Sequence, residues 1–325
     1  VRFDWVEQIG EEVTRQSLAA IAGAVDTRQL AGAPLVVFNP IAGPRTDLVT
    51  ARVPLSEEAE AVEVLGSDGE RISCEVISWE QAPDTEMELD RHGLETRLAR
   101  ILSGLRSGES IQAVEIEVEG DTASVDLILA PLPPVAEVVA RCRTAIRGIL
   151  ADQALHRFRL RLRHHGELEL RFVAPQVPAH GHKTFGVRPV APVARVQALG
   201  EAPRIENDLF SVKADPGSGT LTVTDKASGM VLPGLHRFVD EGDRGDEYND
   251  CPPENDRLVA TPAEPPVCRI VESGPVRQTL EISQVYRVPA GLKPDRAQRS
   301  EGLVHLPITT RVSLPAGVPR IEFST

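Results

Sequence analysis

The side chains best suited to chemistry gather in one acidic segment, residues 240–256. It holds eight aspartates and glutamates and one arginine, and no apolar periodicity runs through it. Gly242 and Gly245 free its backbone, and Pro252-Pro253 stiffens its exit. We therefore predict a long loop between strands, a kind of segment that commonly carries function.

Three interpretations of this acidic segment stay open. A run of charge is most often a solvated surface. Oxygen-rich loops also bind calcium, but the spacing of Asp240, Asp243 and Asp246 departs from the Asp-x-Asp-x-Asp-Gly ligand pattern. Carboxylates accept hydrogen bonds from sugar hydroxyls, and aromatic rings pack on sugar faces. Tyr248, one of two tyrosines in the chain, fits that third use.

The histidines and cysteines give weaker signals. His180 and His182 alternate as strand residues do and have no third metal ligand at a suitable spacing. His164 and His165 are expected to be solvated at a hairpin turn. No Cys-x-x-Cys pair occurs, and Cys142 is expected to be buried on the apolar face of a helix.

The surrounding elements predict a mainly β fold: antiparallel β-sandwich domains, including the first part of a large one at the C-terminus, with an N-terminal helix and an α+β insertion. The helix spans residues 3–28, with an apolar stripe that should pack on neighbours. We place the end of a helical linker at 1–31, a β-domain at 34–190 and a large sandwich at 201–325. The Ala/Pro/Val-rich segment 189–203 marks the boundary between the last two.

The insertion covers about 80–153 and interrupts the β-domain. Helical stripes at 94–105 and 135–149 flank a hairpin that turns at Gly120. A further hairpin is predicted to turn at His165-Gly166, and 205–213 is predicted to be a single strand.

Composition excludes several partners. The formal net charge of −13 over 325 residues argues against nucleic acid and against an anionic membrane surface. No apolar run approaches the ~20 residues of a membrane span. The chain starts at Val1 and ends in a strand-like run, so we expect it to be cut from a longer, bacterial and cytoplasmic protein. A homo-oligomer is compatible with the sequence.

At four places the sequence resembles the C-terminal half of glycoside hydrolase family 38, the α-mannosidase family, in its bacterial form. The four stretches, in chain order, are 35–49, 172–185, 205–225 and 237–248. Their order and spacing match across about 34–325, apart from the insertion. The fourth is the most specific, because it ends in Gly245-Asp246-Glu247-Tyr248 where many eukaryotic members have Ser-Gly-Ala-Tyr.

The resemblance implies a zinc-dependent, retaining parent enzyme that acts on α-mannoside-type carbohydrates. Its zinc ligands and nucleophile belong to an N-terminal barrel, so no catalytic residue or metal ligand is expected in this fragment. The loop is implied to reach the sugar site, with substrate-binding roles for Tyr248, Asp246, Glu247 and Asp243. We expect the fragment alone to be inactive.

Two other functions are kept open. One is a stand-alone carbohydrate-binding or scaffold β-sandwich module. The other is an aldose-epimerase-like enzyme, which rests on fold analogy alone and would need a convergent acid and base.

Overall fold

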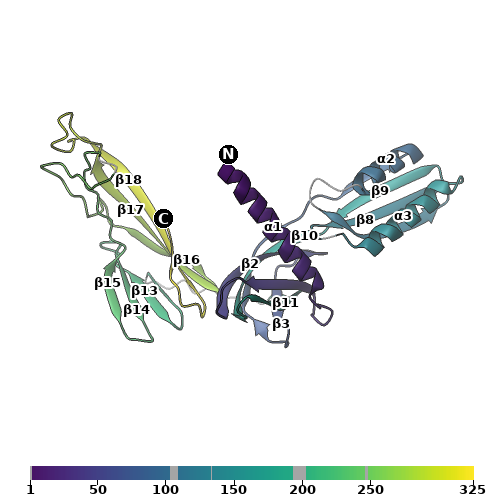
Figure 1. The fold of residues 1–325 in the computed structure, drawn as a ribbon, viewed down its shortest axis with the longest axis horizontal. Coiled ribbons are helices and arrows are strands. Elements are labelled where there is room, and N and C mark those ends of the chain that lie inside the picture. The colour runs from purple at the N-terminus through teal and green to yellow at the C-terminus, as the bar shows by residue number, and fades with distance from the viewer. Residues whose placement is uncertain (1, 103–108, 133, 193–202, 246–247) are drawn as a thin grey trace. The chain divides into compact units, whose positions relative to one another are not determined.

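The chain is mainly β, as the apolar alternation predicted, and the described strands form five sheets (Figure 1). The computed structural model describes residues 2–102, 109–132, 134–192, 203–245 and 248–325. It divides into two compact units. The first comprises Val1–Ala42, Thr50–Arg171 and Pro178–Val193, and the second comprises Gly43–Val49, Phe172–Val177 and Ala194–Thr325.

The N-terminal helix, α1, spans Arg2–Ala24. It ends before the predicted residue 28 because Asp26 folds the chain into a turn, where its carboxylate accepts hydrogen bonds from the backbone and side chain of Arg28. The apolar stripe was predicted to pack on neighbours in an upstream part of the protein, and this stays a prediction. Among the described residues, Phe3, Ile9 and other members of the stripe are exposed.

The β-domain of the first unit contains two small sheets. One has the strand order β1-β11-β3-β4 and the other β2-β10-β5. The bounds are β1 Ala33–Asn39, β2 Arg45–Leu55, β3 Val62–Gly66, β4 Arg71–Ile72, β5 Cys74–Glu80, β10 Gly166–Val177 and β11 Gly181–Pro189. The boundary between the two units falls inside β2 and β10.

The α+β insertion is a two-layer block that we call the insertion block. Its sheet has the order β6-β9-β8-β7. The bounds are β6 Thr85–Leu89, α2 Arg91–Leu102, β7 Ser110–Glu119, β8 Thr122–Ala130, α3 Ala136–Ala151 and β9 Arg157–His164. The predicted hairpin of β7 and β8 is confirmed, with Gly120 at φ 60° in its turn.

Apolar residues of both helices and of the strands share one core in this block, including Leu98, Ile146, Leu127 and Phe158. Asp90 accepts a hydrogen bond from the Gly93 amide and so caps the start of α2. Next to it, Arg91 donates to the carbonyl of Leu150 in the last turn of α3 and to those of Asp152 and Leu155 beyond its end, which ties the two helices together.

The predicted hairpin at His165-Gly166 is wrong. Strand β9 lies in the insertion block, parallel to β8, whereas β10 belongs to a different sheet. The alternating Phe158, Leu160 and Leu162 point into the core of the insertion block, so their burial decides the partner of β9. The block therefore continues to His164, beyond the predicted residue 153.

The large C-terminal sandwich is confirmed in the second unit. Its sheets have the orders β12-β13-β14-β15 and β16-β17-β18-β19. The bounds are β12 Arg204–Glu206, β13 Phe210–Ala214, β14 Leu221–Asp225, β15 Val231–Leu235, β16 Val267–Ser273, β17 Arg277–Pro289, β18 Leu303–Pro315 and β19 Glu322–Ser324. Both sheets contribute to one core, in which Val212 and Leu221 pack with Leu280 and Val312.

The strand predicted at 205–213 is divided into β12 and β13. The Asn207 side chain accepts hydrogen bonds from the amides of Leu209 and Phe210, which stabilises a turn at the break.

Candidate functional site

The acidic segment lies in the connection between β15 and β16. Hydrogen bonds, which we call rungs, join the outgoing half of the segment to the returning half, and we call these halves its two arms. At the base, Asp240 and Val259 exchange two backbone hydrogen bonds of 2.9 Å. Further along, the Gly242 amide donates to the Asp256 carboxylate at 3.0 Å, and the Arg244 amide donates to the Cys251 carbonyl at 2.8 Å. The segment is thus a closed finger, whose tip lies between residues 244 and 251.

Arg299 clamps the base of this finger. Its guanidinium pairs with the Asp240 carboxylate at 2.6 Å and donates to the Arg257 carbonyl at 3.2 Å. Only 7% of the Arg299 side chain is exposed, so the charge of Asp240 is neutralised in a largely dry environment. Sequence reasoning missed Arg299, because it comes from the separate connection between β17 and β18.

That connection supports the finger at a second place. The Asn255 amide donates to the Ala297 carbonyl at 3.1 Å, and Asn255 forms a bridge with Gln298. The position of Gly242 has no room for a side chain. A Cβ built on it would lie 2.9 Å from Pro253 Cγ and 3.0 Å from Arg299 Cδ. A glycine is required there because the two connections approach so closely.

Two of the four predicted sugar-binding residues lie at or near the tip. Tyr248 is 85% exposed. Asp243 is exposed, and its carboxylate accepts a 2.8 Å hydrogen bond from the Gly245 amide. Gly245 has φ 87°, the left-handed conformation that turns the chain at the tip. Asp246 and Glu247 lie outside the described residues.

An aromatic cluster anchors the start of the finger to the sandwich. The His236 ring contacts the Phe238 ring edge-on at 4.7 Å and stacks on Phe323 at 6.4 Å, and Phe238 lies edge-on to the buried Tyr286 at 6.3 Å. Burial lowers the pKa of His236 below its usual value, although its contact with the Gly219 carbonyl opposes that shift.

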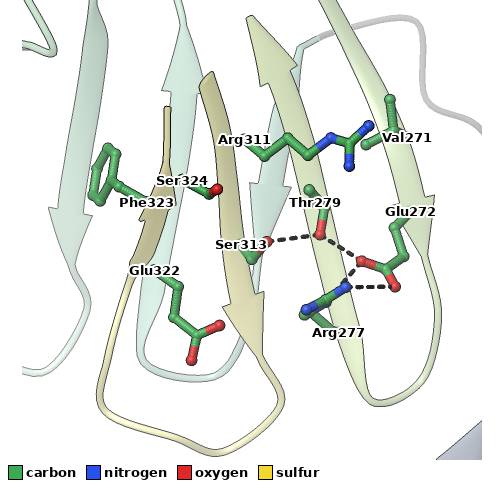
Figure 2. Close-up of a pocket in the computed structure, with 9 residues that line it drawn as sticks. All are labelled: Val271, Glu272, Arg277, Thr279, Arg311, Ser313, Glu322, Phe323 and Ser324. Atoms are coloured by element: carbon green, nitrogen blue, oxygen red, sulfur yellow. Dashed lines mark hydrogen bonds and ion pairs between the residues drawn. The ribbon is translucent and has the colours of Figure 1, made fainter. Parts of the chain in front are cut away.

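A groove of about 540 Å³ lies on the outer face of the sheet β16-β17-β18-β19 (Figure 2). Figure 2 shows the Glu272 carboxylate next to Arg277 and Thr279: it pairs with Arg277 at 2.7 Å and accepts a 2.6 Å hydrogen bond from Thr279. Thr279 and Ser313 also share a 2.8 Å hydrogen bond. The remaining lining residues are Val271, Arg311, Glu322, Phe323 and Ser324.

The groove lies apart from the connection that supports the finger, although one of its lining residues, Phe323, stacks on His236 at the start of the finger. Thr279 lies near the first residue of β17, whereas the connection that supports the finger leaves β17 after Pro289. Roughly ten strand residues separate them, which corresponds to about 33 Å along the strand.

The described residues contain no group of three or more His, Cys, Asp or Glu side chains arranged to hold a metal ion. The calcium interpretation loses one of its ligands, since Asp240 is engaged by Arg299. His182 packs its ring 5.9 Å from that of Phe38.

The prediction of solvated histidines at 164–165 is wrong. Only 13% of the His164 side chain is exposed, and its Nδ1 lies 2.8 Å from a Glu109 carboxylate oxygen. Burial lowers the pKa of the neighbouring His165. The expected burial of Cys142 is confirmed, and that burial raises the pKa of its thiol. In the described part of the chain, no helix combines the length and apolar character needed to cross a membrane.

No family model matches the sequence, and no curated protein matches it. Several solved structures share its fold. A glycosyl hydrolase family 38 protein from Enterococcus faecalis superposes with a TM-score of 0.65 at 16% identity, over 99% of this chain and 34% of that one. An alpha-mannosidase from Enterococcus faecalis V583 gives a TM-score of 0.63 at 16% identity, over 99% of this chain and 33% of that one. The chain thus spans about a third of each protein. The resemblance predicted from sequence is confirmed at the level of the fold.

Proposed function

We propose that the chain is the non-catalytic, C-terminal part of an α-mannosidase-like glycoside hydrolase of family 38. The observation that carries this proposal is the fold match, which covers 99% of the chain and leaves two thirds of each matched protein without a counterpart. The four sequence stretches, read independently of the fold, favour the same family. In this proposal the reaction is carried out on a catalytic barrel outside these residues.

The finger contributes to the sugar site in this proposal. A phenol hydroxyl both donates and accepts a hydrogen bond, so Tyr248 at the exposed tip can orient a sugar hydroxyl. The carboxylates of Asp243, Asp246 and Glu247 add acceptors for neighbouring hydroxyls. The rungs and Arg299 hold the base of the finger in one geometry, and such pre-organisation is what makes a positioning contact effective in the transition state.

No step of the hydrolysis is assigned to this chain. Retaining hydrolysis needs an acid/base and a nucleophile carboxyl about 5 Å apart on opposite sides of the scissile bond. Three carboxylates of the finger already have partners. Asp240 pairs with Arg299, Asp256 accepts a hydrogen bond from the Gly242 amide, and Asp243 accepts one from the Gly245 amide. In this proposal the zinc that the resemblance implies belongs to the barrel.

The test compares two tyrosine variants of the intact parent enzyme. Tyr248→Phe is expected to lower kcat/KM for an α-mannoside roughly tenfold, the effect of one lost hydrogen bond to the substrate. Tyr286→Phe is the matched control, because the only other tyrosine of the chain is 3% exposed in the sandwich. Equal kinetics for both variants and the unaltered enzyme would exclude a positioning role for Tyr248.

The groove of Figure 2 supports a second candidate function, a carbohydrate-binding module that acts without a barrel. Its neighbouring carboxylate, guanidinium and hydroxyl groups can bind vicinal sugar hydroxyls. Titration of the 325-residue chain with mannose oligosaccharides tests it by NMR. Binding with a dissociation constant of about 1 mM that Thr279→Val removes would favour this candidate, and absence of binding would favour the first.

A further inference from the structure

One face of the sheet in the insertion block is left open. Helices α2 and α3 cover the other face, where their apolar side chains share a core with the inward residues of the strands (Figure 1). On the open face, several outward side chains are exposed. Those of Glu88, Arg157 and Arg163, for example, are 79%, 74% and 52% exposed.

The open face carries a row of positive charge and a row of negative charge, one on each side of β8. Strand β9 presents Arg157, Arg159, Arg161 and Arg163 at alternate positions. Strand β7 presents Glu115, Glu117 and Glu119. Both strands pair directly with β8, so the two rows lie at equal distances from it.

The register aligns the charges across the sheet. Arg157 and Glu119 flank Thr122, and Arg159 and Glu117 flank Ser124. The small, uncharged Thr122 and Ser124 therefore lie between a basic and an acidic row. At the next outward position of β8, Asp126 lies between Arg161 and Glu115 and pairs with Arg161 at 3.6 Å and with Arg163 at 2.9 Å.

Ion pairs within the described part of the sheet engage the arginines of the basic row but not the glutamates of the acidic row. Arg159 and Arg161 pair with Glu86 of β6 at 3.1 and 3.3 Å. Among the described residues, no ion pair reaches the three glutamates of β7. Glu115 even lies directly opposite Asp126, an arrangement of like charges that destabilises a sheet. The described residues of the sheet thus supply no ion-pair partner for the acidic row.

We propose that the open face is the interface of a homodimer. Its twofold axis lies midway between the two stacked sheets, directly over β8 and parallel to it. Rotation by 180° about that axis places the arginines of β9 over the glutamates of β7 of the second copy, and the reverse contact follows by symmetry. Sheets stack about 10 Å apart, a distance that an extended arginine and glutamate span together. The central contact joins Arg159 of one copy to Glu117 of the other.

The charge pattern favours a second copy over other occupants. A nucleic acid or an anionic membrane needs a face of net positive charge, but acidic strands border the arginines on both sides. An apolar partner would find only Ile128 and Ala113 on the outward positions of β8 and β7. A basic row and an acidic row on opposite sides of β8 are self-complementary, and the charge of Asp126 between them is already paired with Arg163 of its own sheet.

The size of the face sets the expected affinity. The three overlapping strands are roughly 14 Å wide and 30 Å long, so the dimer buries on the order of 900 Å² in total. This is below the area of a permanent interface and is typical of a weak, reversible dimer. We expect a dissociation constant of about 10–100 μM at low salt, which rises with ionic strength.

A charge-swap experiment tests the dimer on the 325-residue chain by sedimentation velocity over a concentration series. Glu117→Arg and Arg159→Glu are each expected to weaken self-association about a hundredfold, because each places like charges together twice. An equimolar mixture of the two variants should dimerise within about tenfold of the unaltered chain, since every reversed charge again meets its opposite. Glu119→Arg with Arg157→Glu forms a second, independent pair.

Glu95→Arg is the matched control. It makes the same change of charge at an exposed position of α2, the helix that packs on the other face of the sheet, so self-association should change less than about threefold. Circular dichroism verifies that each variant is folded. The proposal is overturned if the unaltered chain stays monomeric up to ~1 mM at low salt. It is also overturned if a dimer forms that the charge-swapped pairs neither break singly nor restore together.

Discussion

Arg299 and Asp240 join two connections that lie far apart in the sequence. The Arg299 guanidinium follows the long strand β17, and the Asp240 carboxylate opens the acidic finger, yet Nη2 and Oδ2 are 2.6 Å apart. The same guanidinium donates to the Arg257 carbonyl on the returning arm of the finger. One side chain therefore holds both arms at the base, and the position of the tip depends on it.

Replacing Arg299 with methionine should loosen the finger and lower the free energy of unfolding by about 1–3 kcal/mol, because a largely buried carboxylate loses its partner. Urea unfolding followed by fluorescence measures the change. The double variant Asp240→Asn/Arg299→Met should recover part of the loss, since the unpaired charge is gone. If the double variant is as unstable as the sum of the single variants, the two residues are not coupled.

Gly242→Ala should disturb the finger through steric contact. The added methyl group would meet Pro253 Cγ at 2.9 Å and Arg299 Cδ at 3.0 Å. We expect a loss of about 1–3 kcal/mol, the range typical of overpacking. Gly291→Ala is the control, because a methyl group added at that position would meet no atom of the described residues within 4 Å. Equal unfolding midpoints for the two variants would contradict the close approach.

His236 should make the stability of the sandwich depend on pH. In the unfolded chain the imidazole takes up a proton near pH 6.5, whereas burial keeps the folded pKa lower. The unfolded state thus binds more protons between the two values, and stability falls as the pH drops below 6.5 toward the folded pKa.

The variant His236→Asn tests this dependence. Asparagine tolerates the positive φ of 63° at this position and carries no titratable ring. Unfolding free energies measured on both sides of pH 6.5 should show a smaller slope in the variant than in the unaltered chain. Identical slopes would show that His236 does not titrate differently on folding.

Asp47 should contribute stability that is lost in acid. Burial alone would raise its pKa, but hydrogen bonds from Arg320 and the Leu48 amide, with the charges of Arg320 and Arg45, lower it below 3.8. The contribution is therefore present above pH 3.8 and disappears as the pH falls through the lower folded pKa. Acid titration monitored by circular dichroism should give a shallower transition for Asp47→Asn, and an unchanged transition would contradict the pairing.

Local patterns predicted much of this fold. The hairpin of β7 and β8 and the long strands β16 to β18 follow from apolar alternation between turn residues, which needs no knowledge of distant partners. The break at Asn207 was missed because alternation continues across it, although the side chain forms a turn. Asparagine between two short apolar runs was the available signal.

Partners distant in sequence could not be predicted in the same way. The alternation of β9 shows which residues are buried, but it fits a hairpin with β10 as well as a parallel pairing with β8. Arg299 has no periodic signal, and its ion pair with Asp240 forms only when two connections meet. The finger was predicted as a loop from composition, whereas its rungs depend on single backbone amides that no residue pattern marks.

Strands β6 and β9, the first and last of the insertion block, are antiparallel neighbours, with Thr85 paired to Leu162 and Leu89 to Phe158. The polypeptide therefore enters and leaves the block through adjacent strands about 5 Å apart. A gene segment that encodes such a block can be gained or lost between two strands of a host domain without separating them. The insertion block can therefore be exchanged as a unit, and its charged surface can evolve independently of the β-domain that carries it.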